Sequence, residues 1–338
     1  MTSARSWFLQ KRPIADIEND TLELREHTLP ELKDGEFLMR TILLSLDASN
    51  RIWMSDQDSY LPPVKLGAAM RGVVVGEVIK SRHKDFPAGC LASGLDTWSD
   101  YVVTDGTGLT PMAPLPGLNL ADAFGVLAIA GPTAYIGLHD IGRIKPGDTV
   151  VVTAAAGAVG MVTGQLAKIH GCRTIGVAGG RDKCKLLTEQ YGYDHAIDYK
   201  SENVLERLRE LAPDGIDVHF ENVGGEQLDA ALTHMKIGGT VVMCGLIASY
   251  SSNEPVPGPY MFRNVIYKRL RIEGFLCLDY SKSYPTMQAK LAQWILEGRL
   301  HFKLHVVDGL EKAVETCKLL YNGGNQGKLL VRIGPDPQ

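Results

Sequence analysis

The sequence has few cysteines, and they show none of the spacings that hold metals or disulfide frameworks. The six cysteines stand at positions 90, 172, 184, 244, 277 and 317, with no C-x-x-C pair among them. A disulfide scaffold and a cysteine-rich zinc site are therefore not indicated. Reduced thiols fit a cytoplasmic protein best.

Long apolar runs and a strong excess of charge are also missing. The opening "MTSARSWFLQKRP" is basic but has no apolar core for a signal peptide, and we expect no apolar stretch of 18 residues further on. The formal net charge of -4 gives no general attraction to nucleic acid or to an anionic membrane. The expected partner is a small molecule.

The composition is that of an ordinary α/β protein with room for two domains. The chain has 338 residues, 45% of them apolar and 22% charged, with 36 glycines and 17 prolines. These values argue against disorder, and the length exceeds what one hydrophobic core usually holds.

The pattern of strands changes after about residue 120. Before it, short β-rich runs separated by turn signals predict a bent or barrel-like β domain; they cover residues 5–10, 36–46, 70–79 and 100–104. After it, apolar strands alternate with helical segments; the strands are expected at 149–154, 173–178, 195–199, 218–222, 240–245 and 270–275. Strands that are apolar throughout are buried on both faces, which predicts a doubly wound parallel sheet. The tail, residues 302–333, returns to a strand, helix, strand pattern.

The segment "AAAGAVG", residues 154–160, is close to a dinucleotide fingerprint. Gly157 and Gly160 are expected to let the backbone approach a pyrophosphate at the start of the following helix. Ala155 replaces the first glycine, which is acceptable if the turn needs no positive φ, and Gly164 would let the helix pack tightly on the sheet. A plain strand-to-helix connection is the alternative, and the strand-helix units that follow disfavour it.

The second strand of this unit indicates which dinucleotide. An NAD-selective site usually has an acid about 20 residues past the turn, whereas this chain has Ala178, Gly179 and Gly180 there, followed by Arg181 and Lys183. An open glycine loop beside cations suits a 2′-phosphate, so NADP(H) is the expected cofactor. Asp182 complicates this interpretation, and the alternative is a solvated first helical turn.

Several motifs together resemble one family over nearly the whole chain. They are "LSLD", "SYLPPVKLGAAMRGVVVGEV", "AAAGAVG", "VAGGRDKCKLL", "AIDYK", "FENVGG", "CGLIASY", "VIYKRLRIEGF" and "NQGKLLVRI". The chain resembles the zinc-free medium-chain dehydrogenase/reductases, in particular the group of prostaglandin, curcumin and alkenal double-bond reductases. The resemblance implies a GroES-like catalytic domain of residues 1–125 and 301–338 and a Rossmann NADP-binding domain of residues 126–300. It also implies a homodimer joined through the edge of the nucleotide domain.

The activity that the resemblance implies is NADPH-dependent reduction of the C=C bond of an α,β-unsaturated aldehyde or ketone. The cofactor-binding positions that it implies are Gly157, Ala158, Val159, Gly160, Gly180, Lys183, Tyr199, Asn222, Cys244, Tyr250, Phe275, Leu276, Cys277 and Asn325. Without the resemblance, Tyr199 and Cys244 would be taken as core residues and Asn222 as a strand-end turn residue.

One segment departs from the family pattern. Relatives commonly have "LSLDPYMRGRM", whereas this chain has "LSLDASNRIWM", with Ala48 and Ser49 in place of Pro-Tyr and Asn50, Arg51 and Trp53 nearby. Since that loop borders the substrate cleft in the family, the substrate cannot be transferred from a relative, and the pocket is expected to differ.

No zinc ligands are visible, and we expect no catalytic metal. The chain has Asp47, Ala48 and Ser49 in the first loop and no Gly-His-Glu segment, and His301 and His305 lie in an extended run where they share no helical face. Without Zn²⁺ to polarise a carbonyl, plain alcohol oxidation loses its usual electrophile, while an enone can still accept hydride if its enolate oxygen is stabilised.

Two tyrosines are candidates for that stabilisation. By the resemblance, Tyr267 in "VIYKRLRIEGF" and Tyr60 in "SYLPPV" match tyrosines placed near substrate. The alternatives are that Tyr267 packs beside the sheet and that Tyr60 only stiffens a proline-rich loop. The other functions left open are quinone reduction, which needs the same cofactor, and a cofactor-binding protein without catalysis.

Overall fold

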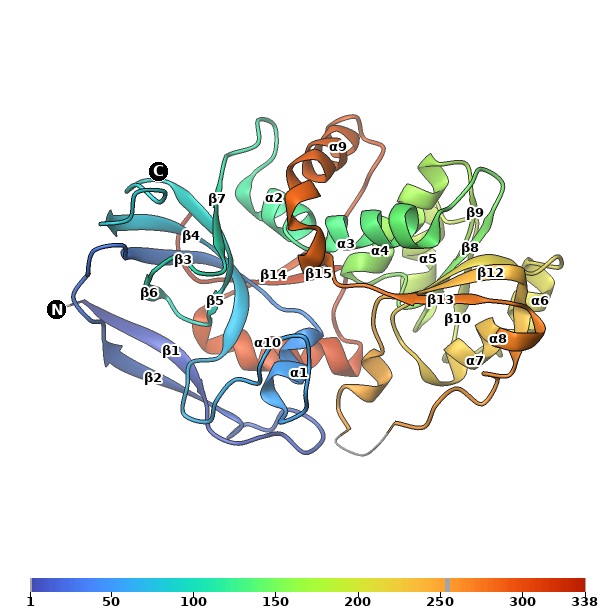
Figure 1. The fold of residues 1–338 in the computed structure, drawn as a ribbon, viewed down its shortest axis with the longest axis horizontal. Helices are drawn as coiled ribbons and strands as arrows, with labels where there is room; N and C mark the ends of the chain where they lie inside the picture. The colour runs from blue at the N-terminus through green and yellow to red at the C-terminus, as the bar shows by residue number, and fades with distance from the viewer. Residues whose placement is uncertain (1, 253–255, 338) are drawn as a thin grey trace.

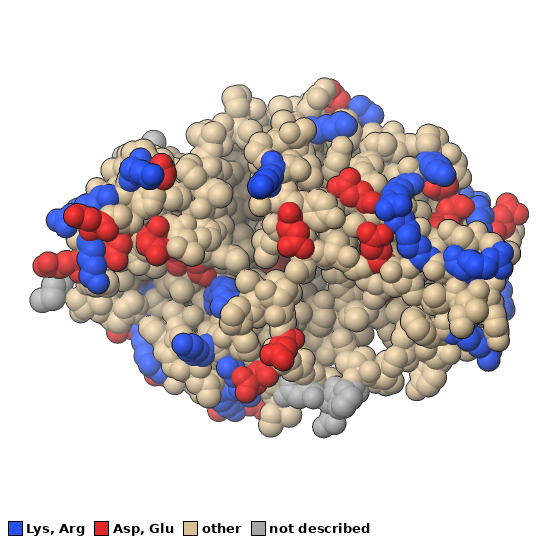
Figure 2. All heavy atoms as spheres, viewed as in Figure 1, with Lys and Arg blue, Asp and Glu red and all other residues tan. Residues whose placement is uncertain are grey.

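The computed structural model describes residues 2–252 and 256–337, and it shows two lobes side by side (Figure 1). One lobe is rich in antiparallel strands and holds the N-terminal segment. The other is built on a parallel sheet flanked by helices. Charged side chains of both signs are spread over the face shown in Figure 2, with no broad basic surface there.

The parallel sheet has six strands in the order β10-β9-β8-β11-β12-β13. The strands are β8 (Thr149–Val152), β9 (Arg173–Ala178), β10 (His195–Asp198), β11 (Ile216–Glu221), β12 (Met235–Met243) and β13 (Arg271–Gly274). All five pairings are parallel, and each strand overlaps an apolar run expected from the sequence. The doubly wound expectation is confirmed.

Both faces of this sheet are covered, which explains why its strands are apolar throughout. Val150 and Val152 pack on one side with residues of α4 (Ala158–Ile169) and α9 (Tyr284–Leu296). Val151 points to the opposite side, among residues of α6 (Val204–Leu211) and α7 (Gly225–His234). The helix α5 (Arg181–Glu189) follows β9.

The other lobe contains a seven-stranded sheet in the order β14-β15-β3-β4-β5-β7, with β6 paired to β3. Its strands are β3 (Phe37–Ser45), β4 (Arg71–Ser81), β5 (Leu91–Thr97), β6 (Tyr101–Thr104), β7 (Leu109–Met112), β14 (Leu304–Asp308) and β15 (Lys328–Arg332). A separate hairpin-like pair joins β1 (Ser3–Leu9) to β2 (Leu22–Thr28). Because β15 pairs antiparallel with β3, the tail of the chain completes the sheet of the N-terminal lobe.

Several elements have no counterpart in the sequence expectations. The strands β2, β5 and β7 are short or contain glycine, proline or charged residues, so their apolar alternation is weak. The helix α1 (Ser49–Met54) falls in the segment that departs from the family pattern. The tail helix α10 (Ala313–Asn322), by contrast, is the helix expected in the tail, and it lies next to α1, below the β-rich sheet in Figure 1.

The expectation that no apolar stretch of 18 residues occurs is wrong. The helical run 120–142, which comprises α2 (Leu120–Leu127), α3 (Ala130–Ile136) and a π-helical turn (Gly137–Gly142), is long and apolar enough to span a membrane by length and composition. Yet 67% of the qualifying window is buried inside the protein. Packing against the parallel sheet and α9 accounts for its apolar character, as in a core helix.

Candidate active site

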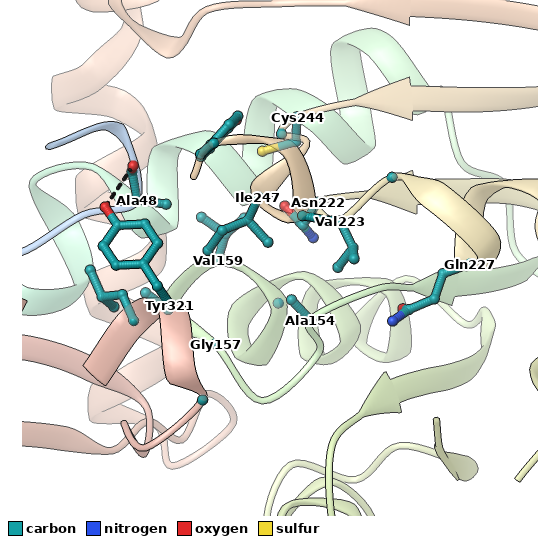
Figure 3. Close-up of a pocket in the computed structure, with 18 of the residues that line it drawn as sticks. Ala48, Ala154, Gly157, Val159, Asn222, Val223, Gln227, Cys244, Ile247 and Tyr321 are labelled. Atoms are coloured by element: carbon teal, nitrogen blue, oxygen red, sulfur yellow. Dashed lines mark hydrogen bonds between the residues drawn. The ribbon is translucent and has the colours of Figure 1, made fainter. Parts of the chain in front are cut away.

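A cavity of about 1330 Å³ lies between the lobes and is lined from both. The turn after β8, the loops after β11, β12 and β13, the segment around α1 and the end of α10 all contribute to its wall. Figure 3 shows Val159, Asn222 and Cys244 from the parallel-sheet lobe facing the same space as Ala48 and Tyr321. Of the predicted site residues, all but Gly180 and Tyr267 line this cavity.

The turn after β8 contains a strained residue one position earlier than the missing glycine. Ala154 has φ 48°, in the left-handed region, whereas Ala155, at the position of the missing glycine, has no positive φ and meets the condition under which alanine is acceptable there. Ala155 itself is completely buried. The helix α4 then begins after Gly157 without a side-chain cap, which leaves its first backbone N–H groups available to an anion in the cavity.

The two later glycines serve the packing of α4. A Cβ on Gly160 would lie 2.5 Å from the carbonyl oxygen of Ala154, so this glycine lets the helix approach its own turn. A Cβ on Gly164 would lie 1.9 Å from the Tyr193 ring, whose hydroxyl donates to the carbonyl of Gly160 at 2.7 Å. Gly164 does allow close packing of α4, as expected, but its direct neighbour is the Tyr193 ring and not the sheet itself.

Two lysines stand at the far end of the cavity, where the resemblance places a 2′-phosphate. Lys183 and Lys200 both line it, and burial together with the like charge of Lys200 lowers the pKa of Lys183. The Lys183 ammonium donates to the carbonyl oxygen of Gly323 at 2.8 Å. Gly179 leaves room for Tyr199 and Lys200, because a Cβ there would lie 2.9 Å from the Tyr199 ring and 3.0 Å from Lys200 Cε.

Gly180 has a structural role instead of lining the cavity. Its φ of 99° is one that glycine adopts without strain, and its N–H donates to Asp198 Oδ1 at 2.7 Å. The same carboxylate accepts hydrogen bonds from Lys200 N and Ser201 Oγ. Asp198 is thus engaged by its own turn and does not line the cavity.

A buried carboxylate organises the loop after β11, and it was not expected from the sequence. Glu221 is completely buried, and its Oε1 accepts hydrogen bonds from Thr153 Oγ1 at 2.8 Å and from the backbone N–H groups of Val223 and Gly224. Its Oε2 contacts His219 Nε2 at 2.7 Å. Burial by itself would raise the pKa of Glu221, but the contact with His219 and the backbone N–H donors lower it below its ordinary value. The sequence signal that could have indicated this role is the glutamate directly before "NVGG", at the end of an apolar strand.

Asn222 is fixed by the same arrangement. Its N–H donates to Thr153 Oγ1 at 2.8 Å, and its side-chain amide donates to the Thr153 carbonyl at 2.7 Å. The ends of β8 and β11 are therefore held together at the cavity floor, which explains a polar residue at this strand end.

Six more of the cofactor-binding positions that the resemblance implies also line the cavity. They are Cys244, Tyr250, Phe275, Leu276, Cys277 and Asn325. Burial raises the pKa of the Cys244 thiol far above its ordinary value, so it remains a protonated wall residue. Tyr250 accepts a hydrogen bond from Leu246 N at 3.0 Å, and Asn325 donates to the Gly327 carbonyl at 3.1 Å. Gly327 forms a backbone bridge with Gly157, which brings the tail to the phosphate turn.

The two candidate tyrosines have different positions. Tyr60 lines the cavity and is 39% exposed, and burial of its hydroxyl raises its pKa. Tyr267 lies in the short helix α8 (Asn264–Tyr267), is 64% exposed and does not line the cavity. In α8, Val265 packs inward on the sheet, and a residue two positions later points to the other side of a helix. The structure does not bring Tyr267 to the site.

The residues of the cavity fit a phosphorylated dinucleotide. An uncapped helix start, a glycine loop without an acid, and two lysines follow one another along one wall. Bound there, the cofactor would have its pyrophosphate at the N–H groups of Ala158, Val159 and Gly160 and its 2′-phosphate at Lys183 and Lys200.

Comparison with known proteins agrees with this geometry. Residues 5–112 match the family model described as the N-terminal domain of oxidoreductase, and residues 158–293 match the one described as zinc-binding dehydrogenase. The NADPH-dependent curcumin reductase of Escherichia coli is 39% identical, over 98% of this chain and 97% of its own. Prostaglandin reductase 1 of Bos taurus is 36% identical, over 98% of this chain and all of its own. The chain belongs to the medium-chain dehydrogenase/reductase family.

A solved member of this family contains the cofactor. The structure of CurA from Vibrio vulnificus in complex with NADPH is 36% identical and superimposes with a TM-score of 0.91, covering 98% of this chain and 99% of that one. The medium-chain dehydrogenase/reductase fold expected from the sequence is therefore confirmed.

The segment that departs from the family pattern forms both the wall and its support. Ala48, Ser49 and Trp53 line the cavity. Asn50 and Arg51 are buried beneath it; Asn50 Oδ1 accepts from Asp47 N at 2.8 Å, and Arg51 Nε donates to the Ala15 carbonyl at 3.0 Å.

The end of α10 supports the same segment. Tyr321, from α10, donates from its hydroxyl to the Ala48 carbonyl at 3.0 Å (Figure 3) and accepts from Arg51 N at 3.2 Å. This contact between positions about 270 residues apart had no signal in the sequence.

The expectation that the protein has no catalytic metal depends on which metal-binding side chains lie close together. Within residues 2–252 and 256–337, no group of three or more His, Cys, Asp or Glu side chains is placed to hold a metal ion. Asp47 is paired with the buried Lys328. His305 lies in the edge strand β14, and His301 is exposed just before it.

Proposed function

We propose that this protein is an NADPH-dependent reductase of the C=C bond of α,β-unsaturated aldehydes and ketones. The observation that supports this best is a single cavity whose one end fits a 2′-phosphorylated dinucleotide and whose other end has neutral hydrogen-bond donors and apolar side chains. Relatives of 36% to 39% identity are named as curcumin and prostaglandin reductases, the first of them NADPH-dependent.

NADPH, when bound, supplies the hydride that adds to the β-carbon of the enone. The chain's own part is to hold the cofactor at Lys183, Lys200 and the start of α4, and to stabilise the negative charge that develops on the carbonyl oxygen. Tyr60 is the proposed donor to that oxygen, because its phenol lines the cavity and its raised pKa keeps it protonated at neutral pH. Its hydroxyl, or water, returns a proton to the α-carbon.

The reaction is proposed to proceed without a catalytic metal. The neutral donors at the substrate end take the place that a Lewis acid has in carbonyl chemistry. Asp47, in the loop where zinc-dependent relatives have a ligand, is held by Lys328 and by Ser45 Oγ.

The test is steady-state oxidation of NADPH against a panel of enals, enones and quinones, with mass spectrometry of the products. Deuterated NADPH should place one deuterium on the β-carbon of the saturated product. Turnover of quinones without turnover of any enal or enone would establish the alternative function, and no turnover with any class would favour a cofactor-binding protein without catalysis.

A homodimer joined at the sheet edge is also proposed. β13 pairs with β12 on one side only among the described strands, and the segment that leads into it has exposed apolar side chains, namely Tyr260 (81%), Phe262 (56%), Ile266 (76%) and Tyr267 (64%). A second copy would pair its own β13 there and cover these groups. Ile266→Asp should shift the mass in sedimentation toward the monomer, whereas Ile14→Asp, at a 78% exposed isoleucine in the other lobe, should not.

A cytoplasmic location is also proposed. All six cysteines have free thiols, which suits a reducing compartment.

A further inference from the structure

The indole N–H of Trp53 is an unexplained polar group in the cavity wall. Trp53 is 3% exposed, lines the cavity, and its Nε1 donates to no acceptor in the described part of the chain. A buried N–H without an acceptor is unfavourable, so its retention calls for a reason.

The neighbour of this indole is the proposed proton donor. The rings of Trp53 and Tyr60 meet edge to face, with centroids 6.4 Å apart and an interplanar angle of 70°. The Tyr60 hydroxyl lies close to Trp53 and to Ser49, and both oppose the rise in its pKa that burial causes. Trp53 lies in α1 and Tyr60 in the loop that directly follows it, so the bend of this loop brings the two rings together.

A third residue braces this pair. The guanidinium of Arg71, at the start of β4, lies 5.7 Å from the centre of the Trp53 ring. The same side chain donates to the Pro62 carbonyl at 3.0 Å, two residues after Tyr60. Arg71 therefore holds both the indole and the loop that presents the phenol.

We propose that Trp53 is a positioning residue for Tyr60: its indole N–H, which has no acceptor in the described structure, takes the phenol oxygen as its acceptor when substrate binds, so that the phenolic proton points to the substrate carbonyl. Tryptophan can only donate, whereas a phenol both donates and accepts. An N–H aimed at the phenol oxygen therefore leaves the O–H to point elsewhere. This inference rests on the proposed function, since it concerns the donor to the enone.

A double-mutant cycle tests whether Trp53 acts through Tyr60. Trp53→Phe, which keeps a ring and removes the N–H, should lower kcat on an enone about three- to tenfold with little change in KM. In a Tyr60→Phe background the same change should have no further effect, because the group that it positions is gone. Equal losses in both backgrounds, or no loss in either, would overturn the proposal. So would a change confined to KM.

A second tryptophan provides the matched control. Trp98 is also completely buried with an unpartnered Nε1, but it does not line the cavity. Trp98→Phe should lower the melting temperature while leaving kcat unchanged. A loss of kcat equal to that of Trp53→Phe would show that the effect is only structural. If Trp53→Phe does not fold, Arg71→Met, which leaves the indole in place, should replace it in the cycle and lower kcat only when Tyr60 is present.

A binding measurement separates this inference from the proposed function. The complex with NADP⁺ should bind 4-nitrophenolate, whose oxygen anion resembles an enolate, and absorbance reports the binding. Tyr60→Phe and Trp53→Phe should each weaken this binding about three- to tenfold, and the double variant should bind no worse than Tyr60→Phe. If no enal or enone is reduced but this cycle holds, the function fails and the positioning role stands. Independent effects on phenolate binding would overturn the role itself.

Discussion

The ring of Tyr193 occupies the space that a side chain on Gly164 would need. A Cβ at Gly164 would lie 1.9 Å from Tyr193 Cζ, and the Tyr193 hydroxyl donates to the Gly160 carbonyl one helical turn earlier. The helix that begins at the phosphate turn is thereby held at a fixed depth against the sheet. The position of its first N–H groups in the cavity depends on this contact.

Gly164→Ala should therefore destabilise the protein by about 3 kcal/mol, because the overpacking displaces Tyr193 and breaks its hydrogen bond. Urea unfolding followed by circular dichroism measures the change. The matched control is Gly258→Ala, where a Cβ meets nothing within 4 Å and where stability should stay within about 0.5 kcal/mol of the parent. Equal stabilities for the two variants would contradict the packing role.

Lys183→Ala should raise KM for NADPH about tenfold to a hundredfold and leave KM for NADH almost unchanged. The reason is that a hydrogen bond to a charged phosphate contributes roughly 1.5 to 3 kcal/mol, and NADH has no 2′-phosphate. Lys185, exposed on the same helix and outside the cavity, provides the control substitution. Equal losses with both cofactors would show that Lys183 serves the fold through Gly323 instead.

Tyr60→Phe should lower kcat on an enone about tenfold or more while changing KM less, since the hydrogen bond strengthens as charge develops on the carbonyl oxygen. Tyr267→Phe, at an exposed position outside the cavity, should stay within about twofold of the parent. The comparison requires a substrate with a primary isotope effect from deuterated NADPH. The reverse order of effects would return the catalytic role to Tyr267.

Removal of metal should leave activity intact. Dialysis against EDTA, followed by elemental analysis, should show substoichiometric zinc with kcat unchanged, because the proposed donors to the substrate are protein hydroxyl and N–H groups. One tightly held zinc per chain, with activity lost on its removal and restored on its return, would refute the metal-free mechanism.

Stability should decline as the pH falls from about 6.5 toward 4, in part because of His139. Burial, together with the nearby His170 and Lys290, lowers the pKa of His139 from 6.5 to about 4. The unfolded chain then takes up a proton in this window that the folded chain does not, so unfolding is favoured as the pH drops. His139→Gln should flatten this part of the stability profile by about 1 to 2 kcal/mol. An unchanged slope between pH 6.5 and 4 would exclude His139 as a source.

The parallel-sheet lobe was predictable because its signals are local. A strand buried on both faces must be apolar throughout, as Val150, Val151 and Val152 are, whatever the rest of the chain does. The absence of an acid after β9 is likewise a property of a few neighbouring residues, and Gly179 does leave room there for Tyr199 and Lys200.

The local sequence pattern did not predict two features of the site, the backbone of the phosphate turn and the direction of the Tyr267 side chain. The phosphate turn has its positive φ at Ala154, one position before the substituted glycine, and the sequence pattern gave no sign of it. Tyr267 belongs to a matching motif, but the direction of its side chain follows from which face of a four-residue helix packs inward.

The sequence by itself determined the order of strands and helices in the parallel-sheet lobe, the dinucleotide turn and the cofactor class, since each depends on residues close together in the chain. Only the tertiary structure decided which side chains share the cavity. Tyr321 holds Ala48 and Glu221 binds Thr153 because separate elements pack together. Such contacts are set by the burial of apolar faces elsewhere in the lobes, and no spacing along the chain records them.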